Sequence, residues 1–139
     1  MSPIDAPLLA EKAAAIERHL SRVAEKLPPS PEQLLPMSDA ADAVILHLWQ
    51  ATQIAIDLAL AACVQLKLGT PGSYAEAFQK LEQTGHLPAD LAGNLVRAAG
   101  FRNLVAHAYE RVDLSRVHAA AKNGPADLRR LLGCLRSLT

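Results

Sequence analysis

AVILHLWQATQIAIDLALAACV, residues 43–64, is the most apolar stretch of this 139-residue chain. Four polar side chains interrupt it: His47, Gln50, Gln53 and Asp57. They fall within about 120° of one another on a helical wheel. A membrane span needs about 18 residues without strongly polar groups, and no window of the chain offers them. The stretch therefore predicts a buried helix with a polar seam.

Signals at both ends set the expected length of this helix. Ser38 is a suitable N-cap, and Gly69 is a suitable residue to end the helix in the left-handed conformation. Between them lie about 30 residues, or roughly 45 Å of helix. We therefore expect one helix that spans the whole domain.

Upstream, apolar residues recur every three or four positions, which predicts a helix from near Asp5 to Pro28-Pro29. This stripe comprises Leu9, Ala13, Ile16, Leu20, Val23 and Leu27. The sequence PPSPEQLLPM, residues 28–37, then predicts a connector, because proline donates no backbone hydrogen bond and disfavours helix in the residue before it.

Downstream, three further helices are expected. Ser73-Tyr-Ala-Glu76 has the form of a capping box, and the helix it opens should end at Gly85. Pro88 suits the first turn of the next helix, which should run to about Tyr109. Asp113 can cap the last, which Asn123-Gly124-Pro125 is expected to interrupt or restart. The prediction is an all-α, up-and-down bundle of five to six helices in a single domain, residues 1–139.

Composition narrows the class of protein. Net charge is zero, which argues against indiscriminate coating of nucleic acid. Residues 1–96 nevertheless hold 6 Lys or Arg against 11 Asp or Glu, whereas residues 97–139 hold 8 against 3. The basic segment, residues 97–139, is expected to form an anion-binding surface or, more commonly, a solvated helix face. Cys63 and Cys134 are too far apart in the sequence for a metal-binding motif. The N-terminus lacks the pattern of a secretion signal, so we expect a cytoplasmic protein.

The segment RNLVAHAY, residues 102–109, breaks the pattern of its helix. The stripe reads Leu91, Leu95, Ala98, Arg102, Val105 and Tyr109. Arg102 and Tyr109 thus occupy places reserved for apolar side chains. Burying an unpaired guanidinium costs several kcal/mol, so Arg102 is expected either to pair with an acid, for which Asp57 is the candidate, or to open onto a cleft or a partner.

Arg102 and His107 lie about 140° apart on one helix, so a straight helix cannot aim both at one small target. Either the helix distorts near Gly100 or at its end, or two chains pair so that Arg102 of one meets His107 of the other. Arginine matches phosphate, and histidine transfers protons near neutral pH. Together they suit attack of a ribose 2′-hydroxyl on the adjacent phosphate. A solvated pair or a salt bridge is the alternative.

The octet resembles the R-x4-H-x-Y signature of the HEPN superfamily, with the polar Asn103 after the arginine. Three longer segments resemble, in order and spacing, the HepT toxins of that superfamily: residues 46–59, 73–95 and 100–120. The resemblance covers about residues 34–138 and leaves residues 1–33 as an N-terminal helix and connector.

The resemblance implies a homodimeric, metal-independent ribonuclease that leaves a 2′,3′-cyclic phosphate and is the toxin of a toxin–antitoxin pair. It implies catalytic roles for Arg102 and His107 and supporting roles for Asn103, Gln53 and Asp57. The implied partner is an antitoxin, a minimal nucleotidyltransferase of the MntA type that transfers AMP to Tyr109. No cofactor, metal, DNA or membrane is expected. The alternative is a non-catalytic helical subunit that scaffolds such a nucleotidyltransferase, with Arg102 in a salt bridge.

Two positions depart from the family pattern, in which an arginine is common at Gln50 and an asparagine at His47. We therefore expect a less positive cleft. Trp49 is expected in the core or a dimer interface and Tyr74 in the core. The remaining histidines lack metal-ligand spacing and are expected at the surface: His19, His86 and His118.

Overall fold

A computed structural model describes residues 4–139, so the first three residues of the predicted domain lie outside it. The described part is all-helical, as predicted, with five α-helices, two short 3-10 helices and no strand. The elements are α1 (Ala6–Lys26), η1 (Pro31–Gln33), α2 (Asp39–Gln65), α3 (Tyr74–Gln83), α4 (Ala89–Ala108), η2 (Tyr109–Arg111) and α5 (Leu114–Arg136).

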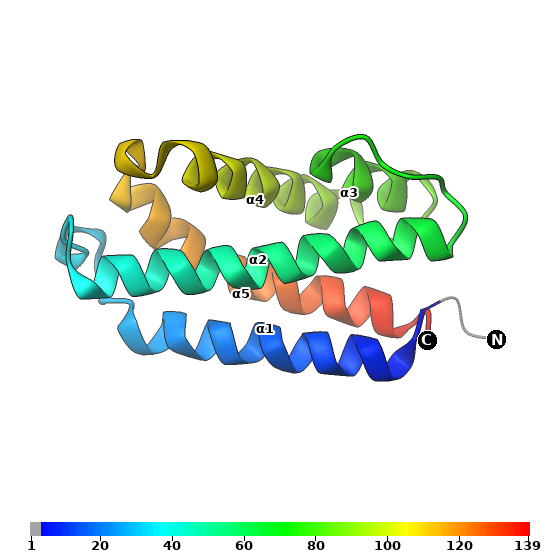
Figure 1. Cartoon of the computed structure of the whole chain (residues 1–139), viewed down its shortest axis with the longest axis horizontal. Coiled ribbons are helices and arrows are strands. Elements are labelled where there is room, and N and C mark those ends of the chain that lie inside the picture. The colour runs from blue at the N-terminus through cyan, green and yellow to red at the C-terminus, as the bar shows by residue number, and fades with distance from the viewer. Residues whose placement is uncertain (1–3) are drawn as a thin grey trace.

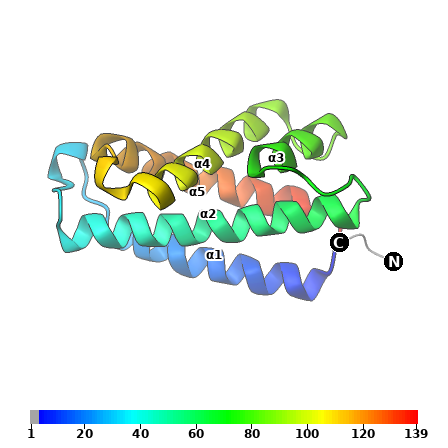
Figure 2. The same ribbon diagram turned by 45° about the horizontal axis from the view of Figure 1, so that its top comes forward.

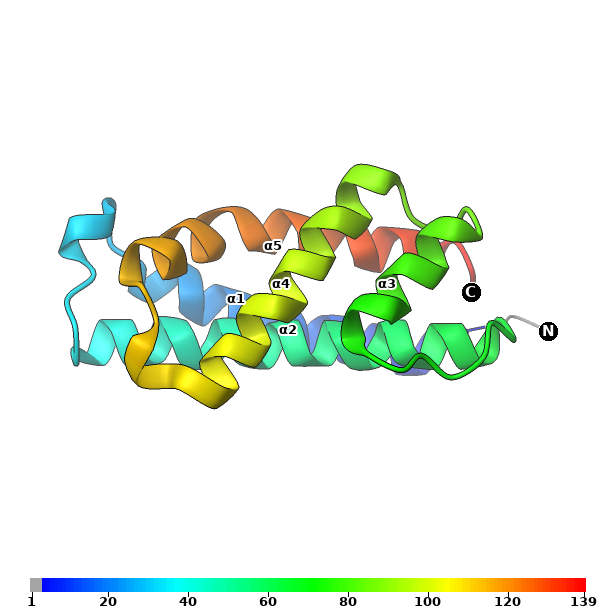
Figure 3. The same ribbon diagram turned by 90° about the horizontal axis from the view of Figure 1, so that it is seen from above.

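Helix α2 is the centre of the bundle and contacts all four other α-helices. It lies beside α1, while α4 crosses it obliquely and α5 runs behind (Figures 1, 2 and 3). By length and composition alone α2 is apolar enough to cross a membrane, but half of its most apolar window is buried inside the bundle. It is a core helix, as its sequence predicted.

The start of α2 was predicted correctly and its end was not. The Ser38 hydroxyl accepts a hydrogen bond from the backbone N–H of Ala41 at 3.1 Å. The helix ends at Gln65, because Lys67 adopts the left-handed conformation (φ 61°) and the N–H of Leu68 donates back to the Cys63 carbonyl at 2.8 Å. Gly69, the predicted stop, lies two residues beyond this turn.

Helix α3 follows the predicted signals. The Ser73 hydroxyl accepts from the N–H of Glu76 at 3.1 Å, which confirms the cap. The Glu76 carboxylate accepts from the N–H of Gly72, one residue before the cap. Gly85 (φ 82°) ends the helix, and the N–H of His86 donates to the Leu81 carbonyl at 2.8 Å.

Helix α5 passes through the predicted interruption, so that prediction was wrong. Its 23 residues include Pro125, and its ribbon is continuous in Figure 3. Proline removes one backbone donor from the helix, but apolar side chains on both sides of it are buried against the bundle: Val117, Ala121, Leu128, Leu131, Leu132 and Leu135. Burying each valine or leucine stabilises the fold by about 1.5–3 kcal/mol, and together these burials exceed the cost of about 3 kcal/mol for a proline inside a helix.

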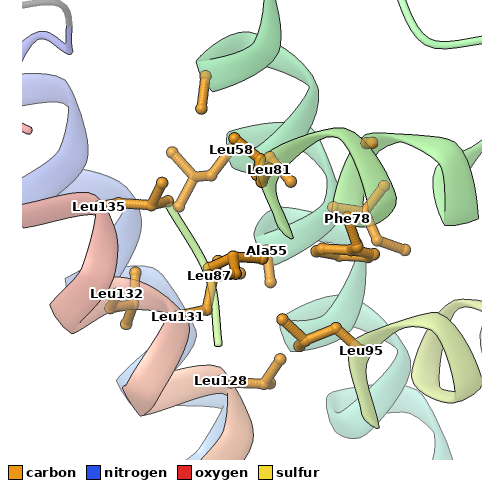
Figure 4. Packing of buried hydrophobic residues seen from close by; sticks show 14 of the residues in the cluster. Ala55, Leu58, Phe78, Leu81, Leu87, Leu95, Leu128, Leu131, Leu132 and Leu135 are labelled. Atoms are coloured by element: carbon orange, nitrogen blue, oxygen red, sulfur yellow. The ribbon is translucent and has the colours of Figure 1, made fainter. Parts of the chain in front are cut away.

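Two apolar clusters form the interior. The larger gathers leucines from α5 and α4 around Phe78 of α3 (Figure 4). The smaller joins the first half of α2 to the end of α4 and the start of α5 through residues such as Ile45, Val105 and Val117. This second cluster holds the end of α4, drawn in yellow, against the first half of α2 (Figures 1 and 3).

Candidate functional site

Arg102 projects from α4 between two aromatic rings. Its guanidinium carbon lies 4.8 Å from the ring centroid of Trp49 and 5.4 Å from that of Tyr74. Trp49 and Tyr74 are half-buried: Tyr74 packs against the larger apolar cluster, where a core position was predicted, and Trp49 packs against the smaller one, where the core or a dimer interface was predicted. The negative face of an aromatic ring attracts a cation without neutralising it. The rings therefore hold the guanidinium in place and leave its charge uncompensated.

The hydrogen-bonding groups of Arg102 are largely unused. Its Nη1 donates to the side-chain oxygen of Asn103 at 3.2 Å, while Nε is buried and has no acceptor. Among residues 4–139, ion pairs to carboxylates engage Arg22, Arg129 and Arg130, at 3.3 Å, 2.9 Å and 3.0 Å, but none engages Arg102. A buried donor without an acceptor costs about 1–3 kcal/mol. Arg102 is thus a half-buried cation with donors available to an anion.

Asp57, the candidate acid for Arg102, does not pair with it, so of the two alternatives for Arg102 this one is not realised with Asp57. Asp57 is exposed and accepts a hydrogen bond from Gln53 Nε2 at 2.9 Å, one helical turn earlier on α2. Gln53 Oε1 is buried without a partner, as is Arg102 Nε. The two expected supporting residues of α2 therefore bind each other.

The predicted polar seam of α2 is divided. His47 turns toward α1, where its Nδ1 lies 3.0 Å from Nδ1 of His19, so one ring donates and the other accepts. Burial and the neighbouring His47 lower the pKa of His19, which is half-buried rather than at the surface as predicted. His118 is also buried, with its Nε2 2.8 Å from the Pro28 carbonyl, whereas His86 is partly exposed.

His107 is exposed in the last turn of α4. Helix α4 is continuous through Gly100, so the distortion considered there is absent, and the backbone leaves helical geometry only at Ala108 (φ −146°, ψ 45°). Arg102 and His107 therefore keep the separation of about 140° expected on one helix. Within one chain the two side chains therefore leave α4 in different directions.

Tyr109 faces outward rather than inward, because it follows the backbone change at Ala108. Its side chain is 48% exposed, and its hydroxyl donates to Asp42 Oδ1 of α2 at 2.6 Å. This hydrogen bond and partial burial raise the pKa of the Tyr109 phenol. The pair borders a hollow of about 400 Å³ whose walls are largely apolar: Ile45, Leu46, Trp49, Val105 and Ala106 complete its lining.

Sequence reasoning missed the roles of three residues at this site: Asp42, Trp49 and Tyr74. The sequence around them gives little signal of these roles. An acid such as Asp42 is common in the first turn of a helix, and aromatic residues on apolar helices are usually core residues. Neither the hollow beside Tyr109 nor another of about 430 Å³ between α4 and α5 is lined by Arg102 or His107. Within residues 4–139 no three His, Cys, Asp or Glu side chains are placed to hold a metal ion.

Comparison with known proteins shows which family shares this sequence and fold. The chain matches the family Ribonuclease HepT-like over residues 16–135. It is 25% identical over 130 residues to the mRNA nuclease HepT of Shewanella oneidensis, covering 94% of this chain and 97% of that protein.

Two solved structures share the fold. One is the tri-AMPylated HEPN toxin of Shewanella oneidensis in complex with its MNT antitoxin, with a TM-score of 0.85, 24% identity and coverage of 96% of this chain and 99% of the other. The second is a toxin–antitoxin structure with AMP-PNP, with a TM-score of 0.85, 23% identity and coverage of 94% and 98%. Because the family match spans most of its length, the chain belongs to the HepT-like ribonuclease family.

Proposed function

We propose that this chain is an endoribonuclease toxin that cleaves RNA, including mRNA, in the cytoplasm without a metal or other cofactor. The observation that carries the proposal is the state of Arg102: a cation fixed between two rings, with a buried unpaired donor and no carboxylate partner. The mRNA nuclease activity named for the Shewanella oneidensis relative supports the substrate class.

The chemistry needs two functions, which Arg102 and His107 supply. The ribose 2′-oxygen attacks the adjacent phosphorus, the bond from phosphorus to the 5′-oxygen breaks, and a 2′,3′-cyclic phosphate remains. Arg102 stabilises the extra negative charge on the phosphate oxygens. His107 accepts the proton of the 2′-hydroxyl or returns one to the leaving oxygen. Asn103 supports the site by accepting from Arg102 Nη1.

A two-fold dimer completes the site in this proposal. Because α4 is continuous, Arg102 and His107 of one chain diverge, and a second copy beside α4 would bring His107 of the partner subunit toward Arg102. Gln53 and Asp57, joined to each other on α2, would line the same cleft. Duplex DNA lacks the 2′-hydroxyl nucleophile and is therefore not a substrate.

The proposed antitoxin is a nucleotidyltransferase of the MntA type, as the MNT complex of the structural neighbour suggests. Its target is Tyr109, whose phenol is exposed two residues after His107. Each AMP added there places bulk and negative charge beside the RNA-binding surface. Substrate RNA would then be excluded by steric hindrance and by charge repulsion.

The alternative, a non-catalytic scaffold for a nucleotidyltransferase, expects Arg102 in a salt bridge. No acid lies within ion-pair distance of Arg102 in residues 4–139, and His107 is exposed. These observations favour the ribonuclease.

The purified protein is expected to cut single-stranded RNA in the presence of EDTA, because both proposed catalytic groups are side chains of the protein. Product ends should carry a 2′,3′-cyclic phosphate, detected by mass spectrometry. The same RNA with 2′-O-methyl groups should stay intact, since it lacks the nucleophile. Cleavage that appears only after a divalent metal is added would contradict the mechanism.

Incubation with the nucleotidyltransferase and ATP is expected to raise the mass of the protein in steps of one AMP. Tyr109→Phe should abolish this gain, because phenylalanine has no oxygen to form the phosphodiester. Tyr74→Phe is the matched control, since it removes the only other tyrosine hydroxyl and should leave the gain unchanged. AMP that remains on the Tyr109→Phe variant would place the modification elsewhere.

A further inference from the structure

One hydrogen bond joins two segments that are 67 residues apart and meet at the edge of the bundle. The hydroxyl of Tyr109, at the start of η2, donates to Oδ1 of Asp42, in the first turn of α2, at 2.6 Å. Both residues are exposed, so water would satisfy the hydroxyl and the carboxylate if this hydrogen bond were absent. A charge-assisted O–H···O⁻ hydrogen bond of this length is strong.

This contact has a chemical consequence for Tyr109. A free phenol has a pKa of about 10 and is protonated at neutral pH. The hydrogen bond to Asp42 raises the pKa of Tyr109 further, so spontaneous ionisation supplies even less phenolate. A neutral phenol attacks phosphorus poorly unless its proton leaves as the new bond forms. Any transfer to this oxygen therefore requires a base within hydrogen-bond distance.

We propose that Asp42 is this base: it accepts the phenolic proton while Tyr109 takes AMP from ATP. The inference rests on the proposed modification of Tyr109. The phenolic oxygen bonds to the α-phosphorus of ATP, the bond from that phosphorus to the oxygen bridging toward the β-phosphorus breaks, and pyrophosphate leaves. The proton passes to the Asp42 carboxylate and then to water, which reaches Asp42 because its side chain is exposed.

The surroundings leave Asp42 as the acceptor. Among the described residues that line the hollow beside the phenol, Asp42 is the one ionisable residue besides Tyr109 itself. The ionisable chain neighbours are His107, Glu110 and Arg111, and the phenol's hydrogen bond goes to Asp42. The apolar part of the lining limits competing hydrogen bonds on that side. Modification also ends the contact, because the phosphodiester has no proton to donate and repels the carboxylate.

A first experiment tests the contact on the protein alone. The chain has two tyrosines, so an ultraviolet absorbance titration resolves few transitions, and Tyr109→Phe identifies the one that belongs to Tyr109. Asp42→Asn should lower the pKa of Tyr109, because the carboxylate that favours the protonated phenol is gone. Asp39→Asn removes the other acid in the first turn of α2 and should leave that transition in place. An unchanged Tyr109 transition in Asp42→Asn would overturn the contact.

The decisive experiment measures initial rates of AMP addition by intact mass, with limiting nucleotidyltransferase, saturating ATP and a range of concentrations of this protein. Asp42→Asn keeps the shape of the side chain and loses the base, so kcat should fall by about 10²-fold or more at neutral pH while the KM of the nucleotidyltransferase for this protein stays within about two-fold. The residual rate should rise about tenfold per pH unit as the phenolate fraction grows, whereas the wild-type rate stays flat across neutral pH. Asp39→Asn should behave as wild type.

The outcomes separate this inference from the function on which it rests. Equal kcat in Asp42→Asn and wild type would overturn the base while leaving Tyr109 as the modified residue. A higher KM with unchanged kcat would also overturn it, by assigning Asp42 to docking. A wild-type protein that gains no mass would overturn the modification and this inference together. RNA cleavage measured in the same preparation shows whether the ribonuclease proposal survives.

Discussion

Replacing Arg102 by alanine is expected to lower the rate of RNA cleavage by about 10²–10³-fold, the usual cost of removing a group that stabilises charge in the transition state. The fold should survive, because Arg102 forms no ion pair and its Nε is already unsatisfied. Circular dichroism and the thermal midpoint should therefore stay close to wild type. Cleavage of a labelled single-stranded RNA in EDTA measures the activity.

Two controls sharpen the result for Arg102. Arg97→Ala removes an exposed arginine of the same helix that hydrogen-bonds Asn94, and it should retain most of the activity. Arg102→Lys keeps the charge but loses the planar fork of donors, so its activity should lie between those of wild type and Arg102→Ala.

Trp49, the only tryptophan, contacts the guanidinium, and its fluorescence should respond to 2′-O-methyl RNA in wild type but weakly in Arg102→Ala. Undiminished cleavage by Arg102→Ala would refute the proposed site.

His107→Ala is expected to lower the cleavage rate by about 10²–10⁴-fold, the range that general acid–base catalysis contributes. His107 is exposed, so its truncation should cost little stability, which thermal unfolding would verify. His107→Gln, which keeps a polar side chain that does not transfer protons, should be as inactive. His86→Ala, a partly exposed histidine outside α4, should leave the rate unchanged.

Mixing the two inactive proteins tests the composite site. If Arg102 of one chain acts with His107 of the partner subunit, a heterodimer of Arg102→Ala and His107→Ala contains one intact site and one doubly altered site. After joint refolding, random pairing should restore about a quarter of the wild-type activity. No recovery, in a mixture shown by mass to contain heterodimers, would mean that each site lies within one chain.

The sequence predicted much of this fold, because its signals act over one or two helical turns. The stripe from Leu9 to Leu27 defined α1, and the caps at Ser38 and Ser73 began α2 and α3 where predicted. The resemblance of residues 102–109 to a family signature predicted a site at Arg102 and His107, which stays a prediction. Two local predictions failed: α5 runs through Pro125, because apolar side chains on both sides of it are buried, and the left-handed Lys67, rather than Gly69, ends α2.

Sequence by itself determined which residues form helices and which face of each helix is apolar, because backbone hydrogen bonding and the 3.6-residue period are local properties. Only the tertiary structure decided what surrounds each polar group. The crossing of α2 and α4 places Trp49, rather than Asp57, against Arg102, and it brings Asp42 to Tyr109. Such pairings depend on the angle and register at which two helices pack, which are set by the sum of many side-chain contacts and not by any one segment.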